Sequence, residues 1–225
     1  MGSIATVLAV VLALFLEQIE TWRRRPRIEL LFDSQSESYI RLLKPKGPPK
    51  GSVEGRYEVY LRIGVKNISR YTAREVELRL VRTTFGGNEE RQNRPGWSFK
   101  ASNLNQLRTT IHSYWTQYYD IAYSIYKPDN EDISAHLILC TLAMLEGREW
   151  PLVKEHIESR PEEIGLTIGA KHQIIFAVVG ENIEAEYFRM ELTAIKLETF
   201  SEDAFRQSLE ASTPEKIDPS LAFDK

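Results

Sequence analysis

The histidines of this chain are spaced too widely to suggest a metal site. A zinc site needs three or four ligands that converge on one point. No two histidines are separated by two or four positions, and the spacing therefore predicts no metal centre. We expect structural roles for His136 and His172, which lie beside apolar runs. The four histidines are His112, His136, His156 and His172.

Cys140 is the only cysteine, and it lies in the apolar stretch Leu137–Leu142. A thiol buried in apolar surroundings has a raised pKa and little reactivity. We therefore expect Cys140 to be a core residue and not a nucleophile. A single cysteine also excludes an internal disulfide, which suits a reducing compartment.

The sequence contains no motif typical of a catalytic or nucleotide site. It has no Gly-x-Ser-x-Gly elbow, no phosphate-binding loop and no Gly-x-Gly-x-x-Gly. Asp129–Asp132 is acidic but lacks the spaced ligands and the glycine of a calcium loop. The sequence thus predicts no catalytic residue, no metal ligand and no cofactor. A hydrolase whose site converges only in the folded chain is an alternative that spacing leaves open.

One segment, residues 105–126, is rich in aromatic side chains. Aromatic residues with a polar tip are favoured at interfaces. An interaction surface is therefore one interpretation of these rings, but we favour the alternative, in which they fill the core of a sandwich and its edges. The residues of the candidate surface are Trp115, Tyr118, Tyr119 and Tyr123.

The first 22 residues have the composition of a membrane anchor. Residues 1–16 carry no charge, and as a helix they would span roughly 24 Å, against a hydrocarbon core of roughly 30 Å. Extension to Trp22 gives about 33 Å and includes Glu17 and Glu20. A cleaved secretion signal and a buried core helix are the alternatives. We predict a single transmembrane helix over residues 1–22.

A basic juxtamembrane segment, residues 23–27, follows the apolar run. Positive charge stays on the cytoplasmic side, so we expect the N-terminus to cross an inner membrane once and residues 23–225 to face the cytoplasm. The bilayer is then the first partner. The net charge of −3 and the pI near 5.9 argue against nucleic-acid binding. The predicted membrane-interface residues are Trp22, Arg23, Arg24 and Arg25.

The rest of the chain alternates between apolar and polar residues with the period of a β-strand. Tyr57–Val65 shows the cleanest alternation, and Ile174–Val179 is apolar on both faces. Eight or nine such segments predict an all-β fold, an antiparallel β-sandwich over residues 28–198. We expect residues 199–225 to form a short helix, capped by Ser201, and a disordered tail from Ser212 onward.

Residues 61–80 read Leu-Arg-Ile-Gly-Val-Lys-Asn-Ile-Ser-Arg-Tyr-Thr-Ala-Arg-Glu-Val-Glu-Leu-Arg-Leu. This segment resembles a hairpin of bacterial immunoglobulin-like modules of the CARDB type. Ser69 occupies a position where glycine is usual. The resemblance implies an immunoglobulin-like sandwich and no activity. Val179–Leu192 is also similar to the final hairpin of bacterial membrane-anchored proteins. The positions that match the CARDB-type pattern are Val65, Asn67, Ala73, Val76, Leu78 and Leu80.

These observations predict a non-enzymatic, membrane-anchored module that binds another protein or itself. Tethering would raise the effective concentration of the domain near its partner. The alternative is an oligomerising sensor or effector subunit of a membrane signalling or defence system that binds a small ligand. Ala5, Ala9 and Ala13 form a small-residue stripe that would allow helix packing in that case.

Overall fold

The computed structural model describes residues 24–44, 57–84, 97–101, 108–127, 132–141 and 162–223, together with Val7, Leu12, Phe15 and Leu16. Over these residues the chain forms thirteen strands and two short helices, α3 (Glu202–Arg206) and α4 (Pro219–Phe223). The strands are β1 (Ile28–Leu31), β2 (Ile40–Leu43), β3 (Tyr57–Asn67), β4 (Ala73–Thr84), β5 (Trp97–Ala101), β6 (Thr109–Ile111), β7 (Thr116–Lys127), β8 (Asp132–Thr141), β9 (Glu162–Gly165), β10 (Lys171–Gly180), β11 (Ile183–Ala194), β12 (Leu209–Ala211) and β13 (Glu215–Ile217).

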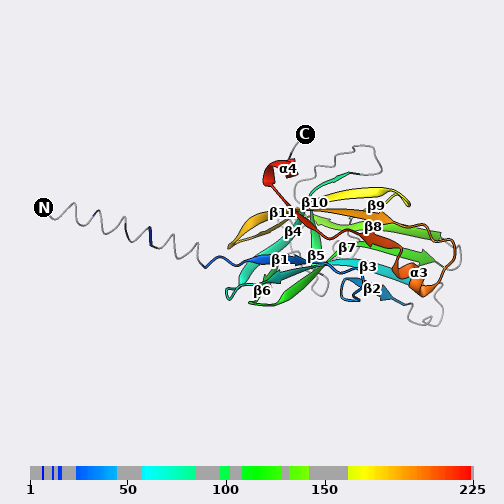
Figure 1. Ribbon diagram of the computed structural model, residues 1–225, viewed down its shortest axis with the longest axis horizontal. Coiled ribbons are helices and arrows are strands. Elements are labelled where there is room, and N and C mark those ends of the chain that lie inside the picture. The colour runs from blue at the N-terminus through cyan, green and yellow to red at the C-terminus, as the bar shows by residue number, and fades with distance from the viewer. Residues whose placement is uncertain are drawn as a thin grey trace, which may run out of the picture.

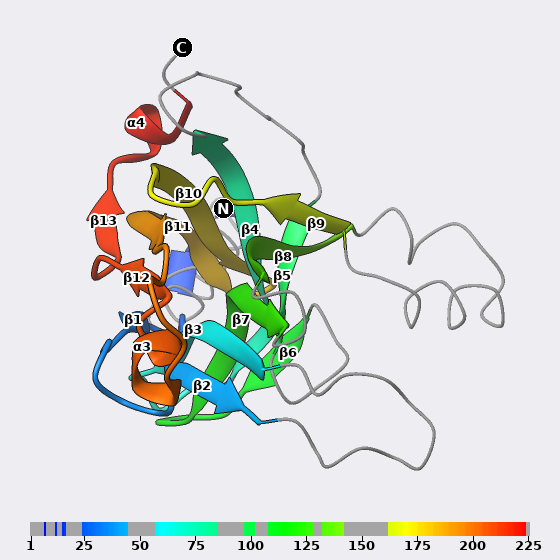
Figure 2. The same cartoon turned by 90° about the vertical axis from the view of Figure 1, so that its right-hand side faces the viewer.

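The strands form two antiparallel sheets (Figure 1, Figure 2). In one sheet β3 pairs with β1, β2 and β7, and β8 follows with β9. In the other, β4 pairs with β6 and β10, and β11 follows with β12 and β13. Strand β5 pairs with β4, β7 and β8, so it joins the two sheets along one side. The prediction of an all-β antiparallel sandwich is confirmed.

The main core lies between the two sheets. Leu61, Ile63 and Val65 of β3 are fully buried, as the alternation of that strand predicts. They belong to the same apolar cluster as Leu78 of β4 and Phe176 of β10. Burying one large apolar side chain contributes about 1.5–3 kcal/mol. The inward faces of the two sheets therefore supply most of the stability.

Strand β10 is central, as its apolar sequence predicts, and both of its faces are covered. Ile174 and Phe176 point into the main core. Ile175 points to the other side, where it packs against Ile217 of β13 and Ala222 of α4. The C-terminal elements thus cover the outer face of the second sheet.

The prediction of a disordered tail is wrong for residues 212–223, although the short helix is confirmed. The Ser201 side chain caps α3 by accepting a hydrogen bond from the Ala204 amide at 3.1 Å. Beyond it, β12 and β13 add to β11, so the sandwich extends past residue 198. The tail is polar along its exposed face, and burial of Ile217 together with strand pairing orders it.

The predicted hairpin over residues 61–80 is also wrong. Strands β3 and β4 follow each other in the chain, but β3 lies in the first sheet and β4 in the second. The connection Ile68–Thr72 therefore crosses from one sheet to the other. Alternation does not distinguish these cases, because both arrangements turn Val65 and Val76 toward the core.

Among the described residues no helix is long and apolar enough to cross a membrane. The predicted anchor covers residues 1–22, of which the structure describes only four. Two of the predicted membrane-interface residues, Trp22 and Arg23, also lie outside the described residues. At those four positions the chain is helical, and each apolar side chain is more than half exposed. They are Val7, Leu12, Phe15 and Leu16.

Candidate functional site: the end where the chain enters the sandwich

Three connections between strands meet where the chain enters the sandwich (Figure 1). They are residues 68–72 between β3 and β4, residues 112–115 between β6 and β7, and residues 181–182 between β10 and β11. The Ile68 amide donates to the Arg27 carbonyl at 2.9 Å, which fixes the first connection against the entering chain. The Arg74 amide donates to the Asn182 side-chain oxygen, also at 2.9 Å. We call this region the entry end.

The buried side chain of Asn67 organises the entry end. Its amide group donates to the carbonyls of Tyr71 at 2.6 Å and Ile111 at 3.0 Å. Its oxygen accepts from the Ser69 amide at 3.0 Å and from the Ser69 hydroxyl at 2.8 Å. Asn67-Ile68-Ser69 matches the N-glycosylation sequon. Both amide protons of the Asn67 side chain, however, donate hydrogen bonds inside the fold. The residue is therefore a structural anchor for two connections.

Exposed aromatic and apolar side chains stand on these connections. Trp115 is 67% exposed, Tyr114 is 64% exposed and Ile68 is 42% exposed. Tyr114 has a left-handed backbone with φ of 62° at the tip of its turn. The ring of His112 meets Trp115 edge-on, with centroids 5.7 Å apart. The entry end thus presents a small apolar surface on a turn that hydrogen bonds hold in place.

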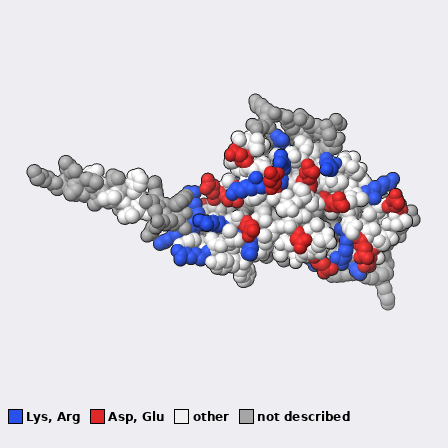
Figure 3. Space-filling view, in the orientation of Figure 1, with Lys and Arg blue, Asp and Glu red and all other residues white. Residues whose placement is uncertain are grey.

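Basic side chains gather at the end of the molecule from which the N-terminal segment extends (Figure 3). Arg25 lies 3.8 Å from Glu184, and both side chains are exposed. The Arg70 guanidinium lies 4.9 Å from the centre of the Tyr71 ring. Carboxylates are also present at this end, namely Glu29, Glu75, Glu181 and Glu184. The basic residues outnumber them: Arg24, Arg25, Arg27, Lys66, Arg70 and Arg74.

The candidate aromatic surface is divided by the fold. Trp115 is exposed, and Tyr118 is half-buried against Tyr39, with ring centroids 5.5 Å apart. Tyr119 and Tyr123 are buried, so these two members of the candidate surface do not belong to it. Tyr119 points into the main core. Tyr123 lies on the outer face of the sheet, because the register of β7 shifts between Asp120 and Ala122, and its ring stacks on those of Tyr60 and His136.

Tyr119 is part of a polar arrangement inside the core. Its hydroxyl donates to the Val76 carbonyl at 3.0 Å and lies 2.9 Å from the hydroxyl of Thr109. Burial raises the pKa of the Tyr119 phenol well above its usual range. The phenol therefore stays protonated and ties β7 to β4 and β6.

Glu77 is a buried carboxylate, with its side chain 1% exposed. Among the described residues that form ion pairs, no other carboxylate is less exposed. It accepts hydrogen bonds from Ser98, from Arg79 Nε at 3.0 Å and from Arg108 Nε at 3.3 Å. Burial raises the pKa of Glu77, but the bonds from Arg79 and Ser98 outweigh it and hold the pKa below its usual value. A saturated carboxylate of this kind joins β4 to β5 and has no lone pair directed at a substrate.

The histidines of the described residues do not form a metal centre. No group of three or more histidine, cysteine or acidic residues suited to a metal ion occurs in the part of the chain that the structure describes. His136 stacks on Tyr123, with centroids 5.4 Å apart, and buried His172 lies 3.1 Å from the Thr167 carbonyl. His156 lies outside the described residues. Cys140 is opposite Ser98 in the pairing of β8 with β5.

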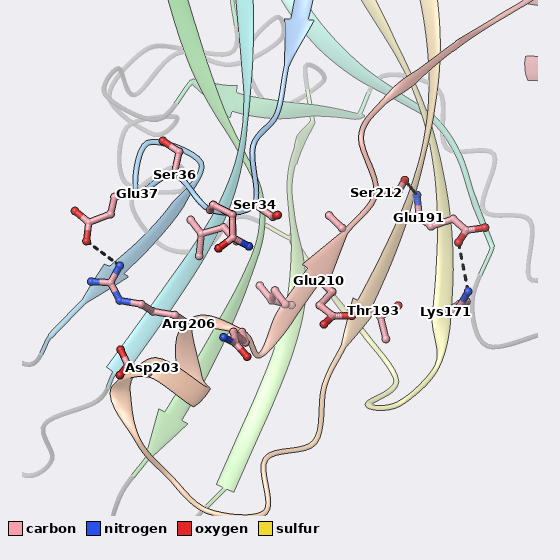
Figure 4. A pocket seen from close by; sticks show the side chains of 15 residues that line it. Ser34, Ser36, Glu37, Lys171, Glu191, Thr193, Asp203, Arg206, Glu210 and Ser212 are labelled. Carbon is pink, nitrogen blue, oxygen red and sulfur yellow. Dashed lines mark hydrogen bonds and ion pairs between the residues drawn. The ribbon is translucent and has the colours of Figure 1, made fainter.

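A polar groove lies at the other end of the sandwich (Figure 4). It has a volume of about 720 Å³, and its walls are the turn Ser34–Glu37, helix α3, strand β12 and the adjoining ends of β10 and β11. Arg206 binds Glu37 at 2.8 Å on one side, and Lys171 lies 3.7 Å from Glu191 on the other. Short side chains such as Ser34 and Ser212 leave space between these pairs. No sequence pattern indicated this groove, because its residues come from four separate segments.

Comparison with protein-family models, with curated proteins and with solved structures finds no match to this chain.

Proposed function

We propose that this chain is a single-pass, membrane-anchored β-sandwich that faces the cytoplasm and acts as an interaction module without catalytic activity. The observation that carries the proposal is the position of the basic segment. Arg27 is hydrogen-bonded to the turn of Ile68, and Trp115 lies on the neighbouring turn. Basic and aromatic residues beside an apolar helix are typical of the membrane–water interface.

Four exposed apolar residues of the N-terminal segment support the anchor. The backbone is helical at the four described positions of residues 1–22. Their side chains are apolar and at least 57% exposed. Leaving a large apolar side chain in water instead of burying it costs about 1.5–3 kcal/mol. A bilayer would cover such a helix on all sides. Local thinning of the bilayer would compensate for its short apolar length.

The direction of insertion follows from charge. Arg24, Arg25 and Arg27 precede the first strand, while residues 1–16 are uncharged. Arginine is retained on the cytoplasmic side during insertion. We therefore place the sandwich in the cytoplasm, where a lone cysteine such as Cys140 stays reduced.

Charged substitutions in the apolar run test the anchor. Val10→Arg combined with Leu14→Arg should release the full chain from membranes at alkaline pH, because each arginine at a helix centre costs about 2.5–3.5 kcal/mol on insertion. Val10→Leu combined with Leu14→Ile is the matched control and should stay in the membrane. Retention of the arginine variant, or release of the unmodified chain, would overturn the anchor.

The groove is the surface that supports partner binding. It lies away from the entry end, so it would face the cytoplasm in the anchored protein. Its ion pairs are accessible, with the Arg206 side chain 35% exposed. Arg206→Glu should remove a co-purifying protein partner from the full chain isolated in mild detergent. Arg41→Glu, which reverses an exposed charge on β2 outside the groove, should retain it. Identical recovery with both variants would contradict the assignment.

The polar lining of the groove also supports the second candidate, a sensor or effector subunit that binds a small ligand. A volume of about 720 Å³ is within the range of small-molecule sites. A small polar compound that raises the thermal midpoint of the full chain, but not that of Arg206→Glu, would favour this candidate. Recovery as a defined oligomer without any protein partner would also favour it.

We further infer that the sandwich is immunoglobulin-like. The support is the arrangement of consecutive strands: β3 and β4 lie in opposite sheets, and buried Asn67 holds the connection between them. An experimental structure whose strand order matches immunoglobulin-like modules would support this finer assignment. A different order would leave an all-β sandwich of another topology.

A further inference from the structure

We propose that the entry end is a lipid-binding surface: Trp115, Tyr114 and Ile68 enter the interfacial layer of the bilayer, and the surrounding basic residues bind anionic headgroups. The inference rests on the proposed anchor and goes beyond it. An anchor alone keeps the sandwich near the membrane but does not fix which of its faces meets the lipid. A lipid-binding entry end instead holds the sandwich against the membrane in one orientation.

The chain between the predicted interface residue Trp22 and the domain is too short for the sandwich to leave the membrane. Pro26 is already buried in the domain. Four residues span at most about 14 Å when fully extended. The headgroup layer itself is roughly 5–8 Å thick on each side. Even a fully extended linker therefore lets the entry end lie no more than roughly 6–9 Å beyond the headgroups.

The exposed side chains of the entry end are those that the interfacial layer favours. Tryptophan and tyrosine are enriched there because an apolar ring and a polar tip suit its two sides. Trp115 is held by hydrogen bonds of its backbone, from its amide to His112 at 3.1 Å and from the Asn67 amide to its carbonyl at 2.9 Å. Because folding has already ordered this turn, insertion of its rings requires little further loss of entropy.

The charge of the entry end is suited to an anionic surface. Six basic residues face four carboxylates there, and the Arg25–Glu184 pair is exposed at 3.8 Å, a geometry that contributes little. Attraction between a basic surface and anionic lipid acts over about 8 Å at physiological salt, a distance that the short linker enforces. An acidic soluble partner would require these charges as well, but it would not account for the exposed aromatic rings beside the anchor.

The test places an environment-sensitive fluorophore on the full chain in vesicles of phosphatidylcholine and phosphatidylglycerol. In a Cys140→Ser background, Tyr114→Cys or Trp115→Cys carries the label at the entry end, and Asp203→Cys carries it on α3 at the opposite end. We expect blue-shifted emission and at least twofold quenching by lipid-borne nitroxide for the first two variants. The label at position 203 should remain water-exposed. Two independent entry-end positions guard against misfolding of one variant.

Charge substitutions then test the headgroup contact. In labelled Trp115→Cys protein, Arg70→Gln with Arg74→Gln should reduce the quenching in anionic vesicles at least twofold. Arg41→Gln with Lys196→Gln, which removes two exposed charges away from the entry end, should leave it unchanged. Vesicles of phosphatidylcholine alone should abolish the difference between the two pairs.

The outcomes separate this inference from the anchor. Flotation of the full chain with vesicles at alkaline pH reports the anchor alone, and its failure would overturn both proposals. A chain that floats while every label remains water-exposed would overturn the lipid-binding surface only. A blue shift without lipid quenching that grows with the protein-to-lipid ratio would identify a second copy as the occupant and would also overturn it.

Discussion

The amide of Asn67 donates a hydrogen bond to the carbonyl of Trp115 at 2.9 Å, so a fully buried residue at the end of β3 holds an exposed tryptophan in place. The side chain of Asn67 binds two further carbonyls, those of Tyr71 and Ile111. The backbone N–H and the side-chain amide of Asn67 therefore together link the crossing between the sheets to the turn that we place on the membrane.

Removing the side-chain amide of Asn67 should lower the stability of the whole domain. Asn67→Ala removes the side-chain donor to the buried Ile111 carbonyl and one of two donors to the Tyr71 carbonyl, and we expect a loss of about 2–4 kcal/mol in the free energy of unfolding. Thermal or urea unfolding of the full chain in detergent measures it. Ile68→Ala, an exposed neighbour, should change stability by less than about 0.5 kcal/mol. Equal effects of the two substitutions would show that the Asn67 network is not a structural anchor.

Glu77→Gln should destabilise the fold by about 2–3 kcal/mol. The substitution removes a buried charge that accepts bonds from Ser98, Arg79 and Arg108. The loss is moderated because both arginines are about 40% exposed and can be hydrated. Glu58→Gln on β3 is a partly exposed control. A change below about 1 kcal/mol for Glu77→Gln would contradict the proposed structural role.

Acid should remove the same stabilisation. The folded pKa of Glu77 lies below the ordinary glutamate value near 4.5. The unfolded chain therefore binds the proton first as pH falls. The contribution of Glu77 is complete above about pH 4.5 and is lost as pH falls through the lower folded pKa. Unfolding measured from pH 7 to pH 3 should show the unmodified protein converging on Glu77→Gln. Parallel curves would mean that another group controls the acid response.

Phe205 should hold helix α3, and with it one wall of the groove. It is fully buried, and its ring lies 5.8 Å from that of Phe200 and 6.1 Å from that of Tyr126. Phe205→Ala should cost about 3–5 kcal/mol, whereas loss of the cap in Ser201→Ala should cost about 1 kcal/mol. Hydrogen exchange over residues 202–211 should rise in the first variant much more than in the second. Unchanged exchange in Phe205→Ala would contradict this packing.

The alternation of apolar and polar residues was sufficient to predict the all-β class and the inward faces of the long strands. It worked for β3 and β10 because each strand has at least one continuous apolar face, and for β10 the apolar second face predicted its central place. It failed at Glu77, which the pattern assigns to the solvent. The partners of Glu77, Ser98 and Arg108, come from segments that sequence spacing does not bring together.

Tertiary relationships account for the other errors. The pattern of β3 and β4 suits a hairpin and a crossing between sheets equally well, and only the pairing with β7 and β10 decides between them. The C-terminal residues lack a strong apolar pattern because Ile217 alone anchors β13. Sequence spacing places Tyr119 and Tyr123 on one face of a strand, but a shift in the register of β7 puts Tyr119 in the core and Tyr123 on the outer face. The groove left no local signal at all.

Protease treatment of sealed membrane vesicles, with an alkaline wash of a separate sample of the same membranes, tests the central claim most directly, because together they report the orientation and the anchoring of the unmodified chain. We predict that the chain stays in the membrane after the wash and that the sandwich is digested only in inverted vesicles, whose cytoplasmic face is outward. Release by the wash, or digestion in right-side-out vesicles, would contradict the account.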